Sequence, residues 1–303
     1  MSAAATTVRA RKLFVILNPN SGSYSARSVQ AALETHFRCD DGSCDVHQVS
    51  GAEDLAELAR EAVSRGVDIV VAAGGDGTVS AVAEGLVGSD RPLGILPLGT
   101  GNILARELGI PIDLDEACDL LAGDFRTTPV DALRVGNRHF YTHVGVGIDA
   151  LMIRDTTREH KRRFGRIAYT WTALVRLIGF QPRRFFLTID GRPYQTRASE
   201  VLVANCGTLG EPPLTWGPGI RPDDGRGDLC VVRASTIWHY LRVSWNVLRK
   251  THRDDPNLRY FPVTQSVSIK TRRPLPVQAD GEIIGETPVE VTVVPGAVRV
   301  AVP

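Results

Sequence analysis

The sequence lacks any apolar run long enough to cross a lipid bilayer. Its longest such stretch, residues 67–73, is interrupted by Asp68, whereas a membrane-spanning helix needs about 20 consecutive apolar residues. The first ten residues are small and polar, without the apolar centre of a signal peptide. We therefore expect a cytoplasmic protein that does not span the membrane.

Cysteine is scarce, and its arrangement argues against two common kinds of site. The chain has five cysteines, an odd number, and no two of them are spaced as C-x-x-C. Zinc sites usually show such paired spacing, and disulfide frameworks use even numbers of cysteines. A reducing compartment suits these residues, and we expect most of them to be buried without a specific role. They are Cys39, Cys44, Cys118, Cys206 and Cys230.

Charge is unevenly distributed along the 303 residues, although the net charge is only +1. Residues 1–150 contain 12 Lys and Arg against 20 Asp and Glu, whereas residues 151–303 contain 23 against 14. The basic excess predicts that the second half meets an anionic partner. Nucleic acid and a phospholipid surface both qualify, so charge alone leaves the two alternatives open.

The first 125 residues alternate between apolar runs typical of buried strands and amphipathic segments typical of helices. Strands joined by helices of this length pair in parallel through right-handed crossovers. We therefore predict a three-layer α/β domain for residues 1–128. Its expected strands are 13–18, 45–50, 67–73 and 93–97, and its expected helices are 25–37, 52–65, 78–86 and 102–108.

From about residue 129 the pattern changes to short β-branched stretches separated by turn residues, which favours an antiparallel β-sandwich. The fold class is thus α/β plus all-β. The second domain is predicted for residues 129–295 with inserted helices near 158–178 and 236–250, and a last strand near 296–303 returns to the first domain. The expected strands are 185–189, 200–204, 229–233, 267–270, 289–294 and 298–302.

A glycine-rich turn, GGDGT at 74–78, lies between an apolar strand and a helix. Glycines let the backbone approach an anion closely, and the N-terminus of the following helix favours negative charge. Asp76 would repel a phosphate unless a cation lay between them, so its presence suggests Mg²⁺. The alternative is an ordinary connection in which the aspartate caps the helix.

Two further polar turns follow predicted parallel strands, namely NPNSG at 18–22 and LGTGN at 98–102. The carboxyl ends of parallel strands meet at one edge of a sheet, which is where such folds bind ligands. Neither a P-loop nor a complete G-x-G-x-x-G motif is present. We therefore expect the three turns to form one phosphate-binding site of another type.

The motifs NPNSG, GGDGT and PLGTGN, in this order and spacing, resemble the diacylglycerol kinase catalytic domain of bacterial lipid kinases, which are related to sphingosine kinases. GVGIDA at 145–150, DDGRGDL at 223–229 and ADGE at 279–282 fall where the family has its later motifs. GGDGT alone is shared with NAD kinases and phosphofructokinases, but the combination is more specific. The resemblance covers nearly the whole chain, and it implies an ATP-dependent kinase that acts on a lipid alcohol.

The resemblance also implies a nucleotide site with Asp76 near the phosphates and Mg²⁺. The family often has Asp where Ile103 stands and Thr where Ser50 stands, so details of this pocket differ. The residues expected to bind the nucleotide are Asn18, Ser50, Gly74, Gly75, Asp76, Gly77, Thr78, Ser80, Gly99, Thr100 and Asn102.

For the acceptor, the resemblance implies that Glu282 is the general base that removes the proton from the lipid hydroxyl. Asp280 competes for this role, since a positioned carboxylate is what activates a weakly nucleophilic alcohol. On pattern alone, Asp280-Gly281 is an ordinary hairpin turn. The resemblance further implies that Asp224 holds a structural Mg²⁺ with the carbonyls of Arg221 and Arg226.

Two segments combine tryptophan with basic residues, 158–184 and 238–250. Such helices suit docking on an anionic lipid surface, but each also needs an apolar stripe to pack on a sheet. We expect peripheral association with the inner face of the membrane, a lipid alcohol as substrate, no nucleic-acid partner and a possible homodimer. The alternatives are a kinase with a soluble acceptor and a non-catalytic lipid-binding module.

Overall fold

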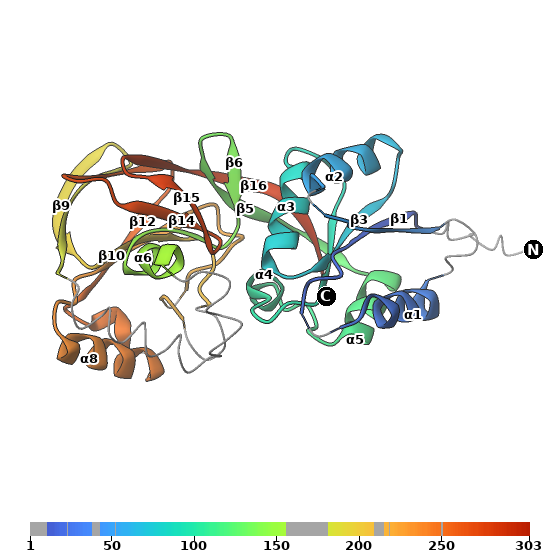
Figure 1. Cartoon of the computed structure of the whole chain (residues 1–303), viewed down its shortest axis with the longest axis horizontal. Coiled ribbons are helices and arrows are strands. Elements are labelled where there is room, and N and C mark those ends of the chain that lie inside the picture. Colours follow the sequence, from blue (N-terminus) through green and yellow to red (C-terminus); the bar gives the residue numbers. More distant parts are fainter. Residues whose placement is uncertain are drawn as a thin grey trace, which may run out of the picture. The chain divides into compact units, whose positions relative to one another are not determined.

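The computed structural model describes residues 11–22, 24–37, 43–51, 53–155, 181–208, 215–217, 219–249 and 251–303. These form two compact units (Figure 1). Unit 1 contains residues 1–128 and 298–303, and unit 2 contains residues 129–297. Each unit has its own hydrophobic core.

Unit 1 is built on a parallel sheet with the order β2-β1-β3-β4, extended by the end of β16. Every residue of β1, β3 and β4 is buried, because both faces of a parallel sheet are covered by helices. The predicted parallel α/β architecture is confirmed. The strands are β1 (Leu13–Leu17), β2 (Cys44–Gln48), β3 (Ile69–Gly74), β4 (Leu93–Pro97) and β16 (Val289–Val302).

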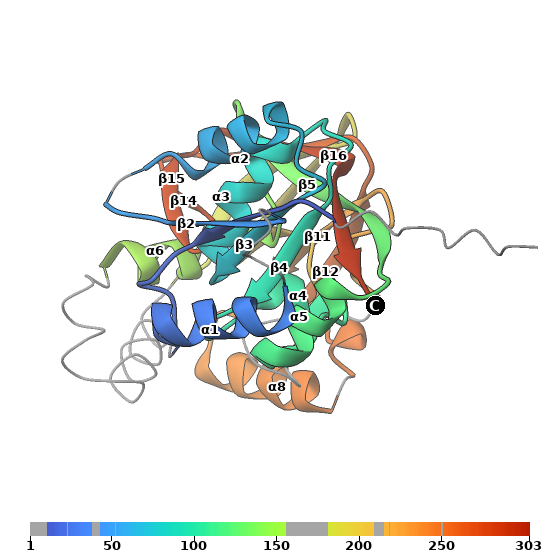
Figure 2. The ribbon, with the colours of Figure 1, turned by 90° about the vertical axis from the view of Figure 1, so that its right-hand side faces the viewer.

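Helices cover both faces of this sheet and complete the three layers (Figure 2). Helices α2 and α3 lie on one face, and α1 and α5 lie on the other. Ser25, Asp54 and Asp113 each cap a helix by accepting hydrogen bonds from backbone N–H groups of its first turn. The helices are α1 (Ala26–His36), α2 (Leu55–Ser64), α3 (Asp76–Leu86), α4 (Ile103–Glu107) and α5 (Leu114–Ala122).

Unit 2 contains two antiparallel sheets, which confirms the predicted β-sandwich. One has the order β12-β11-β10-β7-β14-β15, and the other contains β13, β8 and β9 beside the first part of β16. Buried valines from both sheets dominate the core between them. The strands are β7 (His143–Gly147), β8 (Arg183–Ile189), β9 (Arg192–Ala198), β10 (Glu200–Ala204), β11 (Gly227–Val232), β12 (Leu258–Val263), β13 (Ser266–Thr271), β14 (Pro276–Ala279) and β15 (Glu282–Glu286).

The two strands expected at 289–294 and 298–302 are one continuous strand, β16. The Pro295-Gly296 pair suggested a turn, but Gly296 takes a φ of 56° and donates its N–H to Asp131 Oδ1 at 2.8 Å, so the strand continues. Residues 289–292 pair with β13, and Val300 pairs with Leu93 of β4. β5 (Arg126–Val135), which pairs with β6 (Arg138–Phe140), also runs from one unit into the other.

Two α-helices of unit 2 are described, α6 (Ile148–Asp155) and α8 (Ile237–Leu248), and α8 matches the predicted helix near 236–250. Helix α6 packs against β14 and β7. The helix expected near 158–178 lies outside the described residues. In the described part of the chain, every helix is too short or too polar to span a bilayer.

Candidate functional site

The three polar turns of unit 1 meet at the carboxyl ends of β1, β3 and β4. Asn18 donates its backbone N–H to the carbonyl of Ala73 at 3.0 Å, and Leu98 donates to the carbonyl of Gly74 at 2.9 Å. The Asn18 side chain also donates to Thr78 Oγ1 at 3.0 Å. The turn after β3 is therefore joined to the turns on either side of it.

Glycines make this close contact possible. A Cβ atom added at Gly99 would lie 2.6 Å from the Cα of Gly75, and one added at Gly101 would lie 2.8 Å from Asp76 Oδ2. Gly22, at a φ of 74°, has no room for a Cβ because the carbonyl oxygen of Leu98 occupies that place. The turns thus pack backbone against backbone, and side chains at these positions would separate them.

Asp76 lies in the first turn of α3, whose N-cap is Gly75. Its carboxylate accepts hydrogen bonds from the backbone N–H groups of Asn102 at 2.9 Å and Ile103 at 2.6 Å. These are groups at the start of α4, which an ionised carboxylate satisfies well. Asp76 therefore joins the 74–78 turn to the 98–102 turn. Neither of the two interpretations of the sequence, a phosphate site with Mg²⁺ or a cap of the following helix, included this role.

Asn102 is buried, and its backbone has the left-handed conformation, with a φ of 50°. Its side-chain oxygen accepts from the N–H of Gly99 at 3.0 Å, and its amide nitrogen donates to the carbonyls of Pro97 and Gly99. This side chain closes the 98–102 turn. A direct contact with a nucleotide would require breaking these bonds, so its contribution to such a site is to shape the backbone.

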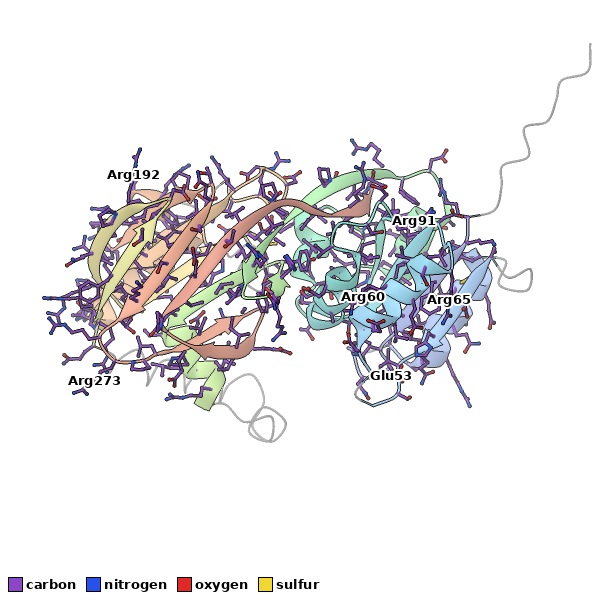
Figure 3. The ribbon with its side chains drawn as sticks, turned by 90° about the horizontal axis from the view of Figure 1, so that it is seen from above. Glu53, Arg60, Arg65, Arg91, Arg192 and Arg273 are labelled. Atoms are coloured by element: carbon purple, nitrogen blue, oxygen red, sulfur yellow. The ribbon has the colours of Figure 1, made fainter. Side chains whose placement is uncertain are left out.

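Ser50 follows β2 and contacts Glu53, a residue that the sequence analysis did not single out and whose position in unit 1 is labelled in Figure 3. Glu53 accepts from the Ser50 hydroxyl at 2.6 Å and from the His47 ring at 2.6 Å. The hydrogen bonds from Ser50 and His47 lower the pKa of Glu53 to about 2. The remaining predicted positions differ in exposure, with Thr100 and Gly77 exposed, Ser80 half-buried and Thr78 buried.

The second group of predicted residues lies in unit 2, at the hairpin between β14 and β15. Asp280 and Gly281 both have positive φ, 45° and 84°, as a two-residue hairpin turn requires. The Asp280 carboxylate accepts four hydrogen bonds from the segment before β7. The donors are the N–H of Tyr141 at 2.9 Å, the N–H and hydroxyl of Thr142 at 3.0 and 2.6 Å, and the N–H of His143 at 3.2 Å.

Unit 2 contains a second turn of the same construction. Asp190, at a φ of 44°, is followed by Gly191 in the β8–β9 hairpin. Its carboxylate accepts hydrogen bonds from Thr264, Gln265 and Ser266 at 2.9–3.0 Å. Burial raises the pKa of Asp190, but these hydrogen bonds outweigh it, and the net shift is downward. An Asp-Gly hairpin that clamps a neighbouring segment is thus a repeated structural device here.

Glu282, two residues after Asp280, is exposed and has a different environment. Its carboxylate forms an ion pair of 3.6 Å with Arg138, and the side chains of Glu282 and Arg138 are 67% and 62% exposed. Such surface pairs contribute about 0–1 kcal/mol to stability. The Glu282 carboxylate is therefore available to a substrate, whereas that of Asp280 is engaged by backbone donors.

A buried polar chain supports the hairpin from inside the sandwich. Gly281 donates its N–H to Gln278 Oε1 at 3.2 Å, and Gln278 Nε2 donates to Asp149 Oδ2 at 2.7 Å. The Asp149 N–H then donates to Glu200 Oε2 at 3.1 Å. Burial, followed by the charge of Asp149, raises the pKa of Glu200 well above its usual range.

Of the three side chains in this polar chain, Gln278, Asp149 and Glu200, only that of Asp149 belongs to a motif that the sequence analysis noted, GVGIDA. The first glycine of that motif, Gly145, leaves room for the Asp149 side chain, because a Cβ atom at this position would collide with the Asp149 carboxylate. No comparable signal marks Gln278 or Glu200, because a lone polar residue within an apolar strand shows no partner until the strands are paired.

The predicted metal site lies in the turn before β11. Asp224 is paired with Arg226, with Oδ2 at 3.0 Å from Nε. The buried Asp131, which the sequence analysis missed, accepts from Gly225 N at 2.7 Å and Gly296 N at 2.8 Å. Burial raises the pKa of Asp131, and the charges of Asp224 and Asp223 raise it further.

Burial and the charge of Asp224 also raise the pKa of Asp228, although Arg226 opposes this effect. Carboxylates that repel one another in this way suit a bound cation, and oxygen donors are the ligands that Mg²⁺ prefers. Across the described ranges, no three His, Cys, Asp or Glu side chains are grouped as metal ligands. A cation at this turn would therefore depend on backbone carbonyls as well as Asp224.

Comparisons with known proteins agree on one family. The diacylglycerol kinase catalytic domain model matches residues 12–135, and the YegS C-terminal NAD kinase beta sandwich-like domain model matches residues 142–302. A diacylglycerol kinase of Mycobacterium tuberculosis is 30% identical over 96% of this chain and 95% of its own length. One of Bacillus subtilis is 29% identical over 91% of both chains.

The fold is shared as well. A solved diacylglycerol kinase structure from Bacillus anthracis (strain Sterne) superposes with a TM-score of 0.77 over 97% of both chains, at 24% sequence identity. The parallel α/β unit and the β-sandwich unit thus occur together in a known protein.

Proposed function

This chain belongs to the diacylglycerol kinase family of ATP-dependent lipid kinases, and on that premise we propose that it transfers the γ-phosphate of ATP to the hydroxyl of a diacylglycerol-like membrane lipid. The observation that carries the proposal is the convergence of three glycine-bearing turns at one edge of the unit 1 sheet. Their backbone N–H groups and the start of α3 suit a chain of phosphates.

The nucleotide-binding role of this edge is supported by two groups of residues, one that holds the turns together and one that is exposed to solvent. Asn18, Asp76 and Asn102 hold the three turns together through their side chains. The exposed Gly77 and Thr100 present backbone and a hydroxyl to the solvent side of the same edge. Rigid turns of this kind can stabilise the charge of the phosphoryl group in the transition state, because their N–H groups need not reorganise during the reaction. Positioning and electrostatic stabilisation of this kind are the main sources of catalysis in phosphoryl transfer.

Glu282 is the residue that we propose as the general base. A base needs an acceptor that can approach the substrate proton, and the exposed Glu282 carboxylate meets this condition. Asp280 is the weaker candidate because four hydrogen bonds direct its carboxylate at residues 141–143. Gln278 and Asp149 hold the hairpin in place from the interior.

Mg²⁺ is proposed at two places, beside the phosphates near Asp76 and at the 221–226 turn with Asp224 and the carbonyls of Arg221 and Arg226. When bound, Mg²⁺ offsets the negative charge of phosphates and carboxylates. The repulsion that Asp224 exerts on Asp131 and on Asp228 supports the second site. Addition of Mg²⁺ should raise the unfolding temperature, and Asp224→Asn should reduce that increase. An equal Mg²⁺ effect in wild type and variant would remove the site from this turn.

Peripheral association with an anionic membrane is supported by α8. Four large apolar side chains on one face of this helix are exposed, Trp238 by 75%, Leu241 by 52%, Trp245 by 59% and Leu248 by 55%. Tryptophan and leucine on one face, with Arg249 beside Trp245, are typical of interfacial helices. Loss of vesicle binding in Trp238→Ala/Trp245→Ala would support this role, and light scattering would test the predicted homodimer.

The activity itself is tested by transfer of labelled γ-phosphate from ATP and Mg²⁺ to lipid alcohols in mixed micelles, with NAD and sugar phosphates as soluble acceptors. We expect label on a lipid in wild type, its loss in Glu282→Gln, and its retention in the matched control Glu286→Gln, which changes an exposed carboxylate on the same strand. Label only on a soluble acceptor would refute the lipid substrate. Label nowhere would favour a non-catalytic lipid-binding module.

A further inference from the structure

Unit 2 contains a cavity of about 590 Å³ at one end of its β8, β9 and β13 strands. Four segments that are distant in sequence line it, namely the end of α6, the start of β8, the end of β9 and the loop after β13. Figure 3 labels Arg273 in this loop, at the opposite end of these strands from Arg192. The lining residues are Leu151, Arg154, Pro182, Arg183, Arg184, Arg197, Thr271, Arg272, Arg273, Pro274, Leu275 and Pro276.

The described residues of this lining carry charge of one sign only. Six of the twelve residues are arginines, and none of the described lining residues is acidic. Within the described part of the chain, Arg184, Arg197, Arg272 and Arg273 form no ion pair with a carboxylate. These four guanidinium groups line one concave site without acidic partners among the described residues, an arrangement that creates a positive potential.

Two of these arginines also oppose each other directly. Arg184 of β8 is the cross-strand partner of Arg197 of β9. Their neighbours Phe185 and Ala198 are buried, so Arg184 and Arg197 both extend from the other face of the sheet. Like charges directly opposite in an antiparallel pair are destabilising. A bound anion between them would convert this repulsion into two attractions.

The remaining lining is largely apolar and comes from Leu151, Leu275 and three prolines. This combination suits a phosphate that is attached to a nonpolar group. Arginine is the side chain best fitted to phosphate, because its planar fork donates two parallel hydrogen bonds. The cavity is formed within unit 2, whereas the turns proposed for the nucleotide belong to unit 1.

We propose that this arginine-lined cavity is a second anion-binding site, which takes the phosphate group of an amphiphilic phosphate ester such as an anionic phospholipid headgroup. The site binds reversibly and takes no part in the transfer chemistry. This proposal therefore does not depend on the function proposed above. A free phosphate ion offers the same chemistry without the nonpolar part, and the experiment separates these two sources.

The experiment measures binding by calorimetry to the full chain, using as separate probes inorganic phosphate and a short-chain, soluble phosphatidylserine, which is not a product of the proposed transfer. The test variant is Arg184→Gln/Arg197→Gln. The matched control is Arg192→Gln/Arg233→Gln, which removes the same charge from exposed positions of the same unit that lie outside the cavity. We expect saturable binding of the phosphatidylserine, about tenfold or more weaker in the test variant and nearly unchanged in the control.

Thermal unfolding provides a readout that is independent of the ligand. Because the substitutions remove a cross-strand repulsion, the test variant should unfold at the wild-type temperature or above it in the absence of phosphate. Saturable binding of inorganic phosphate alone, with the same dependence on the two arginines, would support the anion site and identify a soluble source. Absence of saturable binding to both probes, or equal loss in test and control variants, would overturn the proposal.

Discussion

Replacement of Asp280 by asparagine should destabilise unit 2, even though the backbone conformation suits both residues. Asparagine tolerates the positive φ of this position. However, its amide group can accept on one side only. With its oxygen placed toward Thr142 and His143, its nitrogen would face the N–H of Tyr141, at a position now 2.9 Å away. That N–H loses its acceptor, and the remaining hydrogen bonds lose their ionic character.

The magnitude follows from these contacts. A donor left without its partner costs about 1–3 kcal/mol, and hydrogen bonds to a charged group contribute about 1.5–3 kcal/mol compared with about 1 for neutral ones. We therefore expect a loss of roughly 2–4 kcal/mol in the free energy of unfolding. For a unit of this size, the midpoint of thermal unfolding would fall by roughly 5–15 °C.

Calorimetry on Asp280→Asn, Glu282→Gln and the matched control Asp190→Asn separates structure from chemistry. Asp190→Asn should lose a similar amount of stability, because its carboxylate clamps residues 264–266 in the same way. It should keep its activity at temperatures where it is folded. Glu282→Gln removes only a surface ion pair and should unfold within about 2 °C of the wild type.

Two results would refute this reasoning. The first is an unchanged unfolding temperature in Asp280→Asn, which would show that the four hydrogen bonds do not hold the hairpin. The second is an active Glu282→Gln together with a folded but inactive Asp280→Asn, which would make Asp280 the base.

Further changes test other parts of the structure. Gly99→Ala places a Cβ 2.6 Å from the Cα of Gly75; it should cost about 1–3 kcal/mol of stability and weaken ATP binding, measured by calorimetry, whereas Gly77→Ala has open space and should not destabilise. Glu200 has a raised pKa in the fold, so stability should fall as pH rises above about 4.5, and Glu200→Gln should flatten this slope in denaturant titrations. Glu53 has a lowered pKa, so its contribution to the stability of the fold should be lost as pH falls from about 4.5 toward about 2, and this loss should be absent in Glu53→Gln.

Much of the architecture is determined by local patterns in the chain. The strands β1, β3 and β4 are continuous apolar runs, and every one of their residues is buried. Such runs between amphipathic helices have few stable arrangements other than a covered parallel sheet. Strand β10 and hairpin β14–β15 were likewise predictable, because short β-branched stretches and an Asp-Gly pair carry strong local signals.

Some local signals were misleading because distant groups overrode them. Pro295-Gly296 suggested a break, but Asp131, which lies 165 residues away in sequence, accepts the Gly296 N–H and the strand continues. Helix α5 was not predicted, although Asp113 caps it and its apolar face packs in the unit 1 core. Whether a strand continues or a helix packs is decided by tertiary contacts. These contacts join residues that are too far apart in sequence to be recognised in a short window.

The same division holds for the site. Order and spacing of the glycine turns in the sequence are sufficient to predict a phosphate-binding edge, because strand ends of a parallel sheet must meet there. The roles of individual side chains depend on partners far along the chain. Asp76 caps a helix that begins 27 residues later, and Asp280 clamps a segment nearly 140 residues before it. A carboxylate is a base or a clamp according to what surrounds it, and only folding brings those surroundings together.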